Sequence, residues 1–72
     1  MDNYERLKKQ VEFETKCCID SINRMNPDYD AIPYDITLTD FIGDYGYIDM
    51  YDRGTLFAYL SIKSAIEKIE NP

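Results

Sequence analysis

Two segments with helical hydrophobic spacing, one at each end of the 72-residue chain, constrain the fold most. In both segments apolar residues recur every three or four positions and charged residues lie between them, which is typical of a helix packed on a core. Asn26-Pro27 ends the first segment, because a residue before proline is pushed out of the helical region. Arg53-Gly54 predicts a break before the second, with Thr55 as its cap. We therefore predict helices over about 3–25 and 55–70. Their apolar stripes are Tyr4, Leu7, Val11, Cys18, Ile22 and Met25, then Ala58, Tyr59, Ile62, Ala65, Ile66 and Ile69.

The segment between the two helices fits two structures. YDITL (34–38) and YIDMY (47–51) alternate apolar and polar residues, and the glycines at 43 and 46 fit a turn between two strands. Phe41, Ile42, Tyr45 and Ile48 also fit a helical spacing with Thr39 as cap, although each glycine inside a helix costs about 1 kcal/mol. We predict a single α+β domain over 1–72, in which the two helices flank a short β-hairpin. The alternative is an all-α domain of three helices.

The charges of the chain are unevenly distributed. Seven aspartates and no base lie between residues 28 and 52, whereas the rest of the chain has seven acids and eight bases. The whole net charge of −6 therefore comes from the central segment. A field of this sign repels nucleic acid and anionic membranes and attracts basic surfaces. Neither nucleic acid nor membrane is thus expected as a direct partner.

The residue types needed for most catalytic and metal sites are missing. The chain has no histidine, which excludes Ser-His and Cys-His catalysis within it, and it has no phosphate-binding glycine motif. An EF-hand loop aligned on Gly46 would put Phe41, Gly43 and Tyr45 at its first three ligand positions, where oxygen ligands are required. We therefore expect no enzyme activity, cofactor or metal.

Cys17 and Cys18 are neighbours in the first predicted helix, where adjacent side chains diverge by about 100°. We expect two reduced thiols, one in the core and one near its edge. No run of apolar residues approaches the roughly 20 needed to span a bilayer, and the N-terminus has no signal-peptide pattern. A cytoplasmic protein is expected.

Binding through the tyrosines and aspartates of the central segment is the favoured function. Tyrosine offers a large contact area with few rotatable bonds, and carboxylates pair with arginine or lysine. In a strand over 47–51, Tyr47, Asp49 and Tyr51 would share one face. The other interpretation is a solvated acidic hairpin whose tyrosines cover a thin core. The predicted contact residues are Asp35, Asp40, Asp44, Tyr45, Tyr47, Asp49, Tyr51 and Asp52.

In size, in its lack of histidine and in this acidic segment, the chain resembles the small acidic proteins that phages and mobile elements use to block host enzymes. Uracil-DNA glycosylase inhibitors and several anti-CRISPR proteins are of this type. The resemblance implies an inhibitor or regulator that mimics DNA on a basic site, such as that of a host nucleic-acid-processing or defence enzyme. The alternative is an assembly module that forms a homodimer or docks through its apolar helix stripes.

Overall fold

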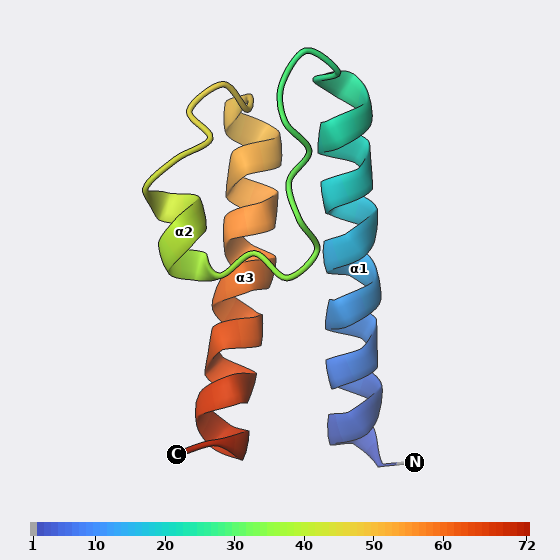
Figure 1. Ribbon diagram of the computed structural model, residues 1–72. Coiled ribbons are helices and arrows are strands. Elements are labelled where there is room, and N and C mark those ends of the chain that lie inside the picture. The colour runs from blue at the N-terminus through green and yellow to red at the C-terminus, as the bar shows by residue number, and fades with distance from the viewer. Residues whose placement is uncertain (1) are drawn as a thin grey trace.

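The computed structural model describes residues 2–72 and contains three helices. They are α1 (Asn3–Met25), α2 (Leu38–Ile42) and α3 (Met50–Glu70). The long helices α1 and α3 lie side by side and antiparallel, so that both ends of the chain lie at the same end of the molecule (Figure 1). The first connection, residues 26–37, runs along one side of this pair, and α2 packs beside α3 on the same side (Figure 1).

The predicted β-hairpin is wrong: no strand occurs in the part of the chain that the structure describes, and the domain is all-helical with three helices. Residues 34–38 turn instead of extending, since the amide of Ile36 donates to the carbonyl oxygen of Pro33 at 3.2 Å. Thr37, not Thr39, then caps α2 by accepting from the amide of Asp40. Tyr45 has a φ of 66°, a left-handed conformation. It lies between two turns, one closed by the bond from the Asp44 amide to the Phe41 carbonyl oxygen and one by the bond from the Ile48 amide to the Tyr45 carbonyl oxygen.

Helix α1 has the predicted bounds. The Asp2 side chain caps it by accepting from the amide of Glu5 at 2.8 Å, and the helix ends before Asn26-Pro27. The buried Thr15 hydroxyl donates to the carbonyl oxygen of Val11 at 2.6 Å, which lets a polar side chain lie on the core face.

Helix α3 begins five residues earlier than predicted, because Asp49 and not Thr55 caps it. Arg53 and Gly54 therefore lie inside the helix rather than at a break. The Arg53 guanidinium donates to the carbonyl oxygens of Asp44 and Tyr45 at 3.2 and 2.7 Å. It also lies 5.0 Å from the centre of the Phe41 ring. Arg53 thus fastens the second connection, residues 43–49, to the start of α3.

The connections complete the hydrophobic core that two helices alone cannot close. Residues from α1 and α3 meet residues from the segment between them, and Phe41 of α2 is fully buried at the centre. Two antiparallel helices bury only one stripe each, so a third layer is needed to exclude water from that stripe. The core cluster is Ile19, Ile22, Ile32, Ile36, Phe41, Ile48, Leu56 and Leu60.

Nearer the termini α1 and α3 have no third layer. There the buried side chains of Val11 and Ile66, together with polar contacts, hold the two helices together. The Lys8 ammonium pairs with the Glu70 carboxylate at 2.8 Å, and the Tyr4 hydroxyl donates to the same carboxylate at 3.2 Å. The ion pair raises the pKa of Lys8 and lowers that of Glu70. None of the helices described is both long enough and apolar enough to cross a membrane.

The buried side of α3 differs from the stripe that the sequence predicts. Of the six predicted residues only Ile66 is buried, and the helix contributes Leu56 and Leu60 to the core instead. Ile62 and Ile69 remain 41% and 67% exposed. The connection and α2 pack on one side of α3, so the predicted stripe is left facing outward.

Candidate protein-binding surface

The structure does not bring the eight predicted contact residues onto one face. The shared face of Tyr47, Asp49 and Tyr51 required a strand, and this segment is a loop followed by the first turn of α3. Ile48, which a strand would place on the opposite face together with Met50, is buried, whereas Met50 is 91% exposed. Each predicted residue therefore has to be considered in its own surroundings.

Tyr45 and Tyr47 pack against the core. The centre of the Tyr45 ring lies 6.0 Å from that of Phe41. The Tyr47 ring stacks on Tyr29 of the first connection with 3.9 Å between centroids, and the planes are within 4° of parallel. Burial, followed by nearby acidic groups, raises the pKa of Tyr47. Tyr47 thus joins the two connections and Tyr45 packs the second connection on α2, so the interpretation that the tyrosines cover a thin core applies to these two.

Asp44 and Asp49 have local structural roles. The Asp44 carboxylate accepts from the amide of Tyr45 at 2.8 Å and supports the turn. The Asp49 carboxylate accepts from the amides of Tyr51 and Asp52 at 2.8 and 3.1 Å and caps α3. The hydrogen bond from the Asp52 amide is the main cause that lowers the pKa of Asp49 below its ordinary 3.8. Desolvation raises the pKa of Asp52, and so do a hydrogen bond to Asp49 and the charge of that carboxylate.

We expect Asp49→Ala to lower the melting temperature at neutral pH, because the first amides of α3 lose their acceptor. Since the folded pKa of Asp49 is depressed, its contribution is complete above the ordinary aspartate pKa and is lost as the pH falls through the folded value. Thermal melts from pH 7 to pH 2 should therefore show a smaller acid-induced decrease for Asp49→Ala than for the wild type. Asp49→Asn, which keeps the acceptor and removes the charge, should melt near the wild type at pH 7. Equal melting of Asp49→Ala and wild type would contradict the capping role.

Four other aspartates of the central segment have no side-chain hydrogen bond or ion pair within residues 2–72. Three lie on the first connection and one on α2, and all are exposed to solvent. The sequence predicted two of them as contacts and missed the pair that follows Pro27, although the run NPDYD places that pair just after a helix end. These four residues, called the acidic face below, are Asp28, Asp30, Asp35 and Asp40.

Tyr29 and Tyr34 lie among the aspartates of the first connection and are both about half exposed. The Tyr34 hydroxyl donates to the Asp20 carboxylate of α1, and this charge raises the pKa of the phenol. The Lys16 ammonium lies 5.8 Å from the centre of the Tyr34 ring. The rings are thus held in place and still offer an edge to a partner.

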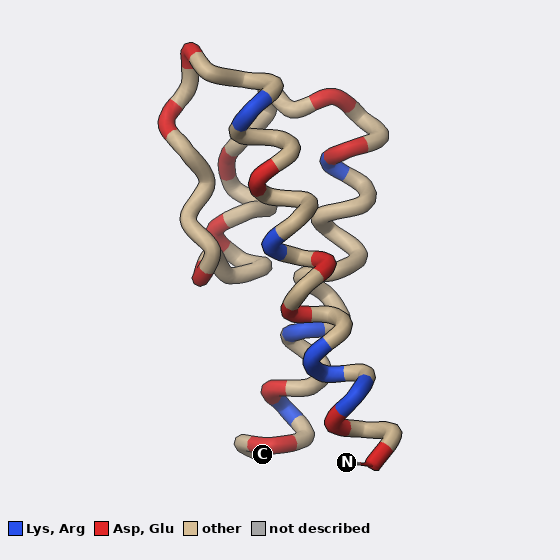
Figure 2. Tube along the Cα trace, turned by 90° about the vertical axis from the view of Figure 1, so that its right-hand side faces the viewer, with Lys and Arg blue, Asp and Glu red and all other residues tan. Residues whose placement is uncertain are grey.

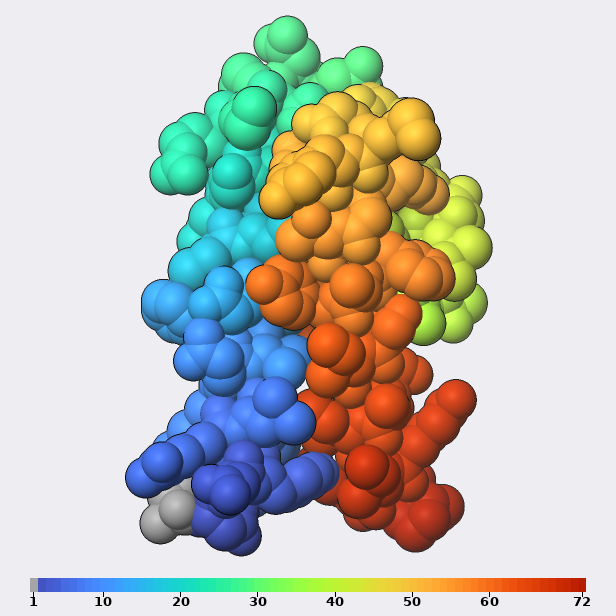
Figure 3. Space-filling model, turned by 180° about the vertical axis from the view of Figure 1, so that it is seen from behind, coloured from blue at the N-terminus to red at the C-terminus, as the bar shows by residue number. Residues whose placement is uncertain are grey.

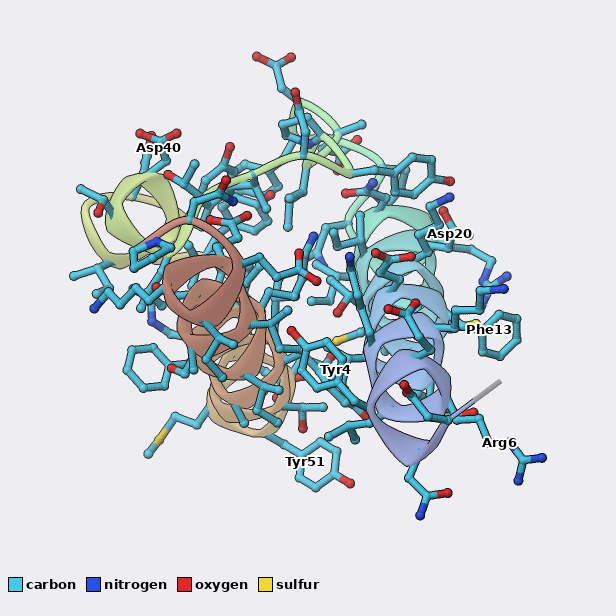
Figure 4. The ribbon with its side chains drawn as sticks, turned by 90° about the horizontal axis from the view of Figure 1, so that it is seen from below. Tyr4, Arg6, Phe13, Asp20, Asp40 and Tyr51 are labelled. Atoms are coloured by element: carbon cyan, nitrogen blue, oxygen red, sulfur yellow. The ribbon has the colours of Figure 1, made fainter. Side chains whose placement is uncertain are left out.

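The charges are separated along the length of the molecule. Five of the eight bases lie on the first half of α1 and the second half of α3, whereas the aspartates of the connections lie toward the other end (Figure 2). The Lys8–Glu70 ion pair belongs to the base-containing end. Asp40 extends from α2 on the side of the helix pair that carries the first connection (Figure 4).

Within residues 2–72 no three His, Cys, Asp or Glu side chains are placed to hold a metal ion together. The hollow between α2 and α3 is open, with Asp35, Lys63 and Glu67 around an apolar floor of Ile36 and Leu60. The thiols of Cys17 and Cys18 are both free, the first exposed and the second half-buried. Burial raises the pKa of Cys18, which reduces its reactivity as a thiolate.

No protein-family model, curated protein sequence or solved structure matches the chain. The assignment of a function therefore rests on the geometry and charge of the surface.

Proposed function

We propose that the protein is a non-catalytic inhibitor or regulator that docks its acidic face on a basic surface of another protein. The observation that carries the proposal is the four exposed aspartates, Asp28, Asp30, Asp35 and Asp40, none of which has an ion-pair partner in the described fold. Charges that make no internal contact contribute little to folding and repel one another. A partner with matching arginines and lysines would relieve this repulsion and be steered toward the face.

Two tyrosines favour a protein partner with arginines at its surface. Tyr29 and Tyr34 are half exposed among the aspartates, and a guanidinium can stack on such a ring while it pairs with a neighbouring carboxylate. The predicted contacts Asp35 and Asp40 are kept in this proposal. Asp28 and Asp30 replace Asp44 and Asp49, whose carboxylates hold a turn and a helix end.

The partner is proposed to be a protein with a groove for nucleic acid, where carboxylates stand in for phosphates. The separation of a −7 segment from an otherwise nearly neutral chain supports this, because DNA offers the same sign of charge to such a groove. A host nucleic-acid-processing or defence enzyme in the cytoplasm fits the description. Direct binding of nucleic acid is disfavoured by the same charges.

Capture from cell lysate by three immobilised proteins tests the proposal. Asp28→Asn/Asp30→Asn/Asp40→Asn neutralises the acidic face, and Glu5→Gln/Glu12→Gln/Glu67→Gln neutralises three exposed acids on the long helices. Both variants change the net charge from −6 to −3, so that only the position of the lost charge differs. We expect the wild type and the glutamine variant to retain the same basic protein at low salt and to release it at high salt, and the asparagine variant to retain at least tenfold less. Equal retention by the two variants would contradict the proposal.

A further inference from the structure

A second surface lies on α3, along the row of residues that faces away from the core. Six positions follow each other at intervals of four, three, four, three and four residues, and none of them is buried. Tyr51, at one end of the row, is 80% exposed and points to the side opposite to α2 (Figure 4). The row, called the α3 seam, is Tyr51, Thr55, Ala58, Ile62, Ala65 and Ile69.

No other part of the described chain covers this side. Seen from behind, the molecule is a layer of two helices, α1 and α3, and α2 is visible only at its edge (Figure 3). A shallow groove runs between the helices on this side, lined by Glu14, Cys17, Cys18 and Ser21 of α1 and by Asp52, Thr55 and Tyr59 of α3. The first connection and α2 provide a third layer on the opposite side only (Figure 1).

Alternating intervals of three and four residues give the 3.5-residue repeat with which a helix contacts another helix in a coiled coil. The α3 seam keeps this repeat over its whole length, yet the core of the protein uses Leu56, Leu60 and Ile66, which lie off it. We propose that the α3 seam binds the α3 seam of a second copy of this chain, in antiparallel orientation, so that the two helix pairs form a four-helix dimer.

The order of residue sizes along the seam suits a second copy. A two-fold interface brings the same surface of both copies together, so the surface has to be complementary to itself. With the axis at the level of Leu60, Ala58 lies opposite Ile62 of the other copy, Thr55 opposite Ala65, and Tyr51 opposite Ile69. Near the axis each pair contains an alanine, which allows the two helices to approach closely, and the large side chains of Tyr51 and Ile69 meet only at the ends of the seam.

The distribution of charge favours the antiparallel orientation. A parallel dimer would place the two acidic ends side by side, each with most of the −6 charge. In the antiparallel dimer the acidic end of each copy lies beside the terminal end of the other, where the four bases Arg6, Lys8, Lys9 and Lys68 balance four acids. The antiparallel orientation thus keeps the two acidic ends apart and reduces the repulsion between the copies.

The available area matches a weak but specific dimer. A 21-residue helix is about 30 Å long, and the two-helix layer is about 20 Å wide. The buried area would be roughly 600 Å² per copy and about 1,200 Å² in total, the lower end of the range for stable interfaces. The dimer is therefore expected to dissociate on dilution into the micromolar range. The acidic faces lie on the opposite side of each helix pair and remain free.

Sedimentation equilibrium of the full chain from about 1 to 500 μM tests the dimer. We expect the wild type to convert from monomer to dimer over this range, and Ile62→Asp and Ala58→Arg to weaken the association at least tenfold. Phe13→Asp is the control, because Phe13 is an exposed apolar residue of α1 that points away from α3 (Figure 4). It should associate as the wild type does. A monomeric wild type at every concentration, or dimers of both seam variants, would overturn the proposal; circular dichroism checks that each variant is folded.

Disulfide trapping tests the orientation, in a Cys17→Ser/Cys18→Ser background. Thr55→Cys and Ala65→Cys lie opposite each other in the antiparallel dimer, so their mixture should give a mixed disulfide dimer. Neither variant alone should form one efficiently. Efficient trapping of each variant by itself, without the mixed species, would show a parallel arrangement and overturn the antiparallel one.

The salt dependence separates this proposal from the binding function of the acidic face. Raising the salt concentration should strengthen the dimer, since it screens the repulsion between two chains of charge −6, whereas it should weaken a complex with a basic partner. The dimer proposal can therefore fail while the proposed binding of a basic partner holds, and the reverse is equally possible.

Discussion

Phe41→Ala is expected to remove about 3–5 kcal/mol from the free energy of unfolding, the usual cost of truncating a fully buried phenylalanine. A domain of 72 residues has a total stability of about 4–11 kcal/mol, so this single change should remove a large part of it. Phe41 has this effect because α2 contributes it to a core that α1 and α3 cannot close alone. Its ring also contacts Tyr45 and lies beneath Arg53, which hold the second connection.

Urea unfolding followed by circular dichroism measures the loss. Phe57→Ala is the matched control, because Phe57 is a phenylalanine of α3 that lies outside the core cluster and is 45% exposed. We expect its cost to be about 1 kcal/mol or less. Similar midpoints for the two variants would mean that α2 is not part of the cooperative core.

Asn23→Ala is expected to cost about 2–3 kcal/mol, because one side chain satisfies both backbone groups of Ile32. The Asn23 carbonyl oxygen accepts from the amide of Ile32 at 2.8 Å, and its amide nitrogen donates to the Ile32 carbonyl oxygen at 3.2 Å. The Ile32 side chain is buried in the core, so water cannot easily replace these partners. The first connection, and with it the acidic face, should become mobile in the variant.

Hydrogen exchange of the Ile32 amide reports the loss directly, and urea unfolding gives its size. Asn71→Ala is the control, since Asn71 is exposed near the end of the chain and its side chain makes no hydrogen bond within the described residues. It should unfold near the wild type. If Asn23→Ala retained slow exchange at Ile32, the connection would be held by its buried side chains alone.

The sequence predicts the long helices well and the connections poorly, for physical reasons that particular residues show. Asn26-Pro27 is a local signal, and α1 ends at the bound that it indicates. The start of α3 was predicted at Thr55 because Arg53-Gly54 is typical of a break. The bonds from Arg53 to the carbonyl oxygens of Asp44 and Tyr45 are tertiary contacts, and no local rule shows that they keep this residue inside the helix.

The hairpin was wrong because alternation of apolar and polar residues does not distinguish a strand from a loop that buries every few side chains. Ile32, Ile36, Phe41 and Ile48 enter the core from turns and a short helix, without a partner strand. The Asn23 side chain provides the hydrogen bonds to Ile32 that a neighbouring strand would give. Such a pairing across nine residues has no sequence signature.

Charge counting located the acidic segment but not its exposed carboxylates. Asp44 and Asp49 were predicted as contacts, and both accept backbone hydrogen bonds whose geometry only the fold determines. Asp28 and Asp30 follow the end of α1 and have no such role. The apolar stripe predicted for α3 was wrong as a core face, since only Ile66 of it is buried, and the buried side depends on the side on which the connection packs.

The central claim is that the position of the carboxylates on the acidic face, and not the net charge of the chain, determines binding to the basic partner. It is tested most directly by titrating the captured partner with the wild type and with the two variants of net charge −3 at several salt concentrations. We predict that Asp28→Asn/Asp30→Asn/Asp40→Asn weakens binding at least tenfold and flattens the dependence of affinity on salt. The Glu5→Gln/Glu12→Gln/Glu67→Gln variant should stay within about threefold of the wild type at each concentration. Equal affinities and equal salt dependence for the two variants would contradict the claim.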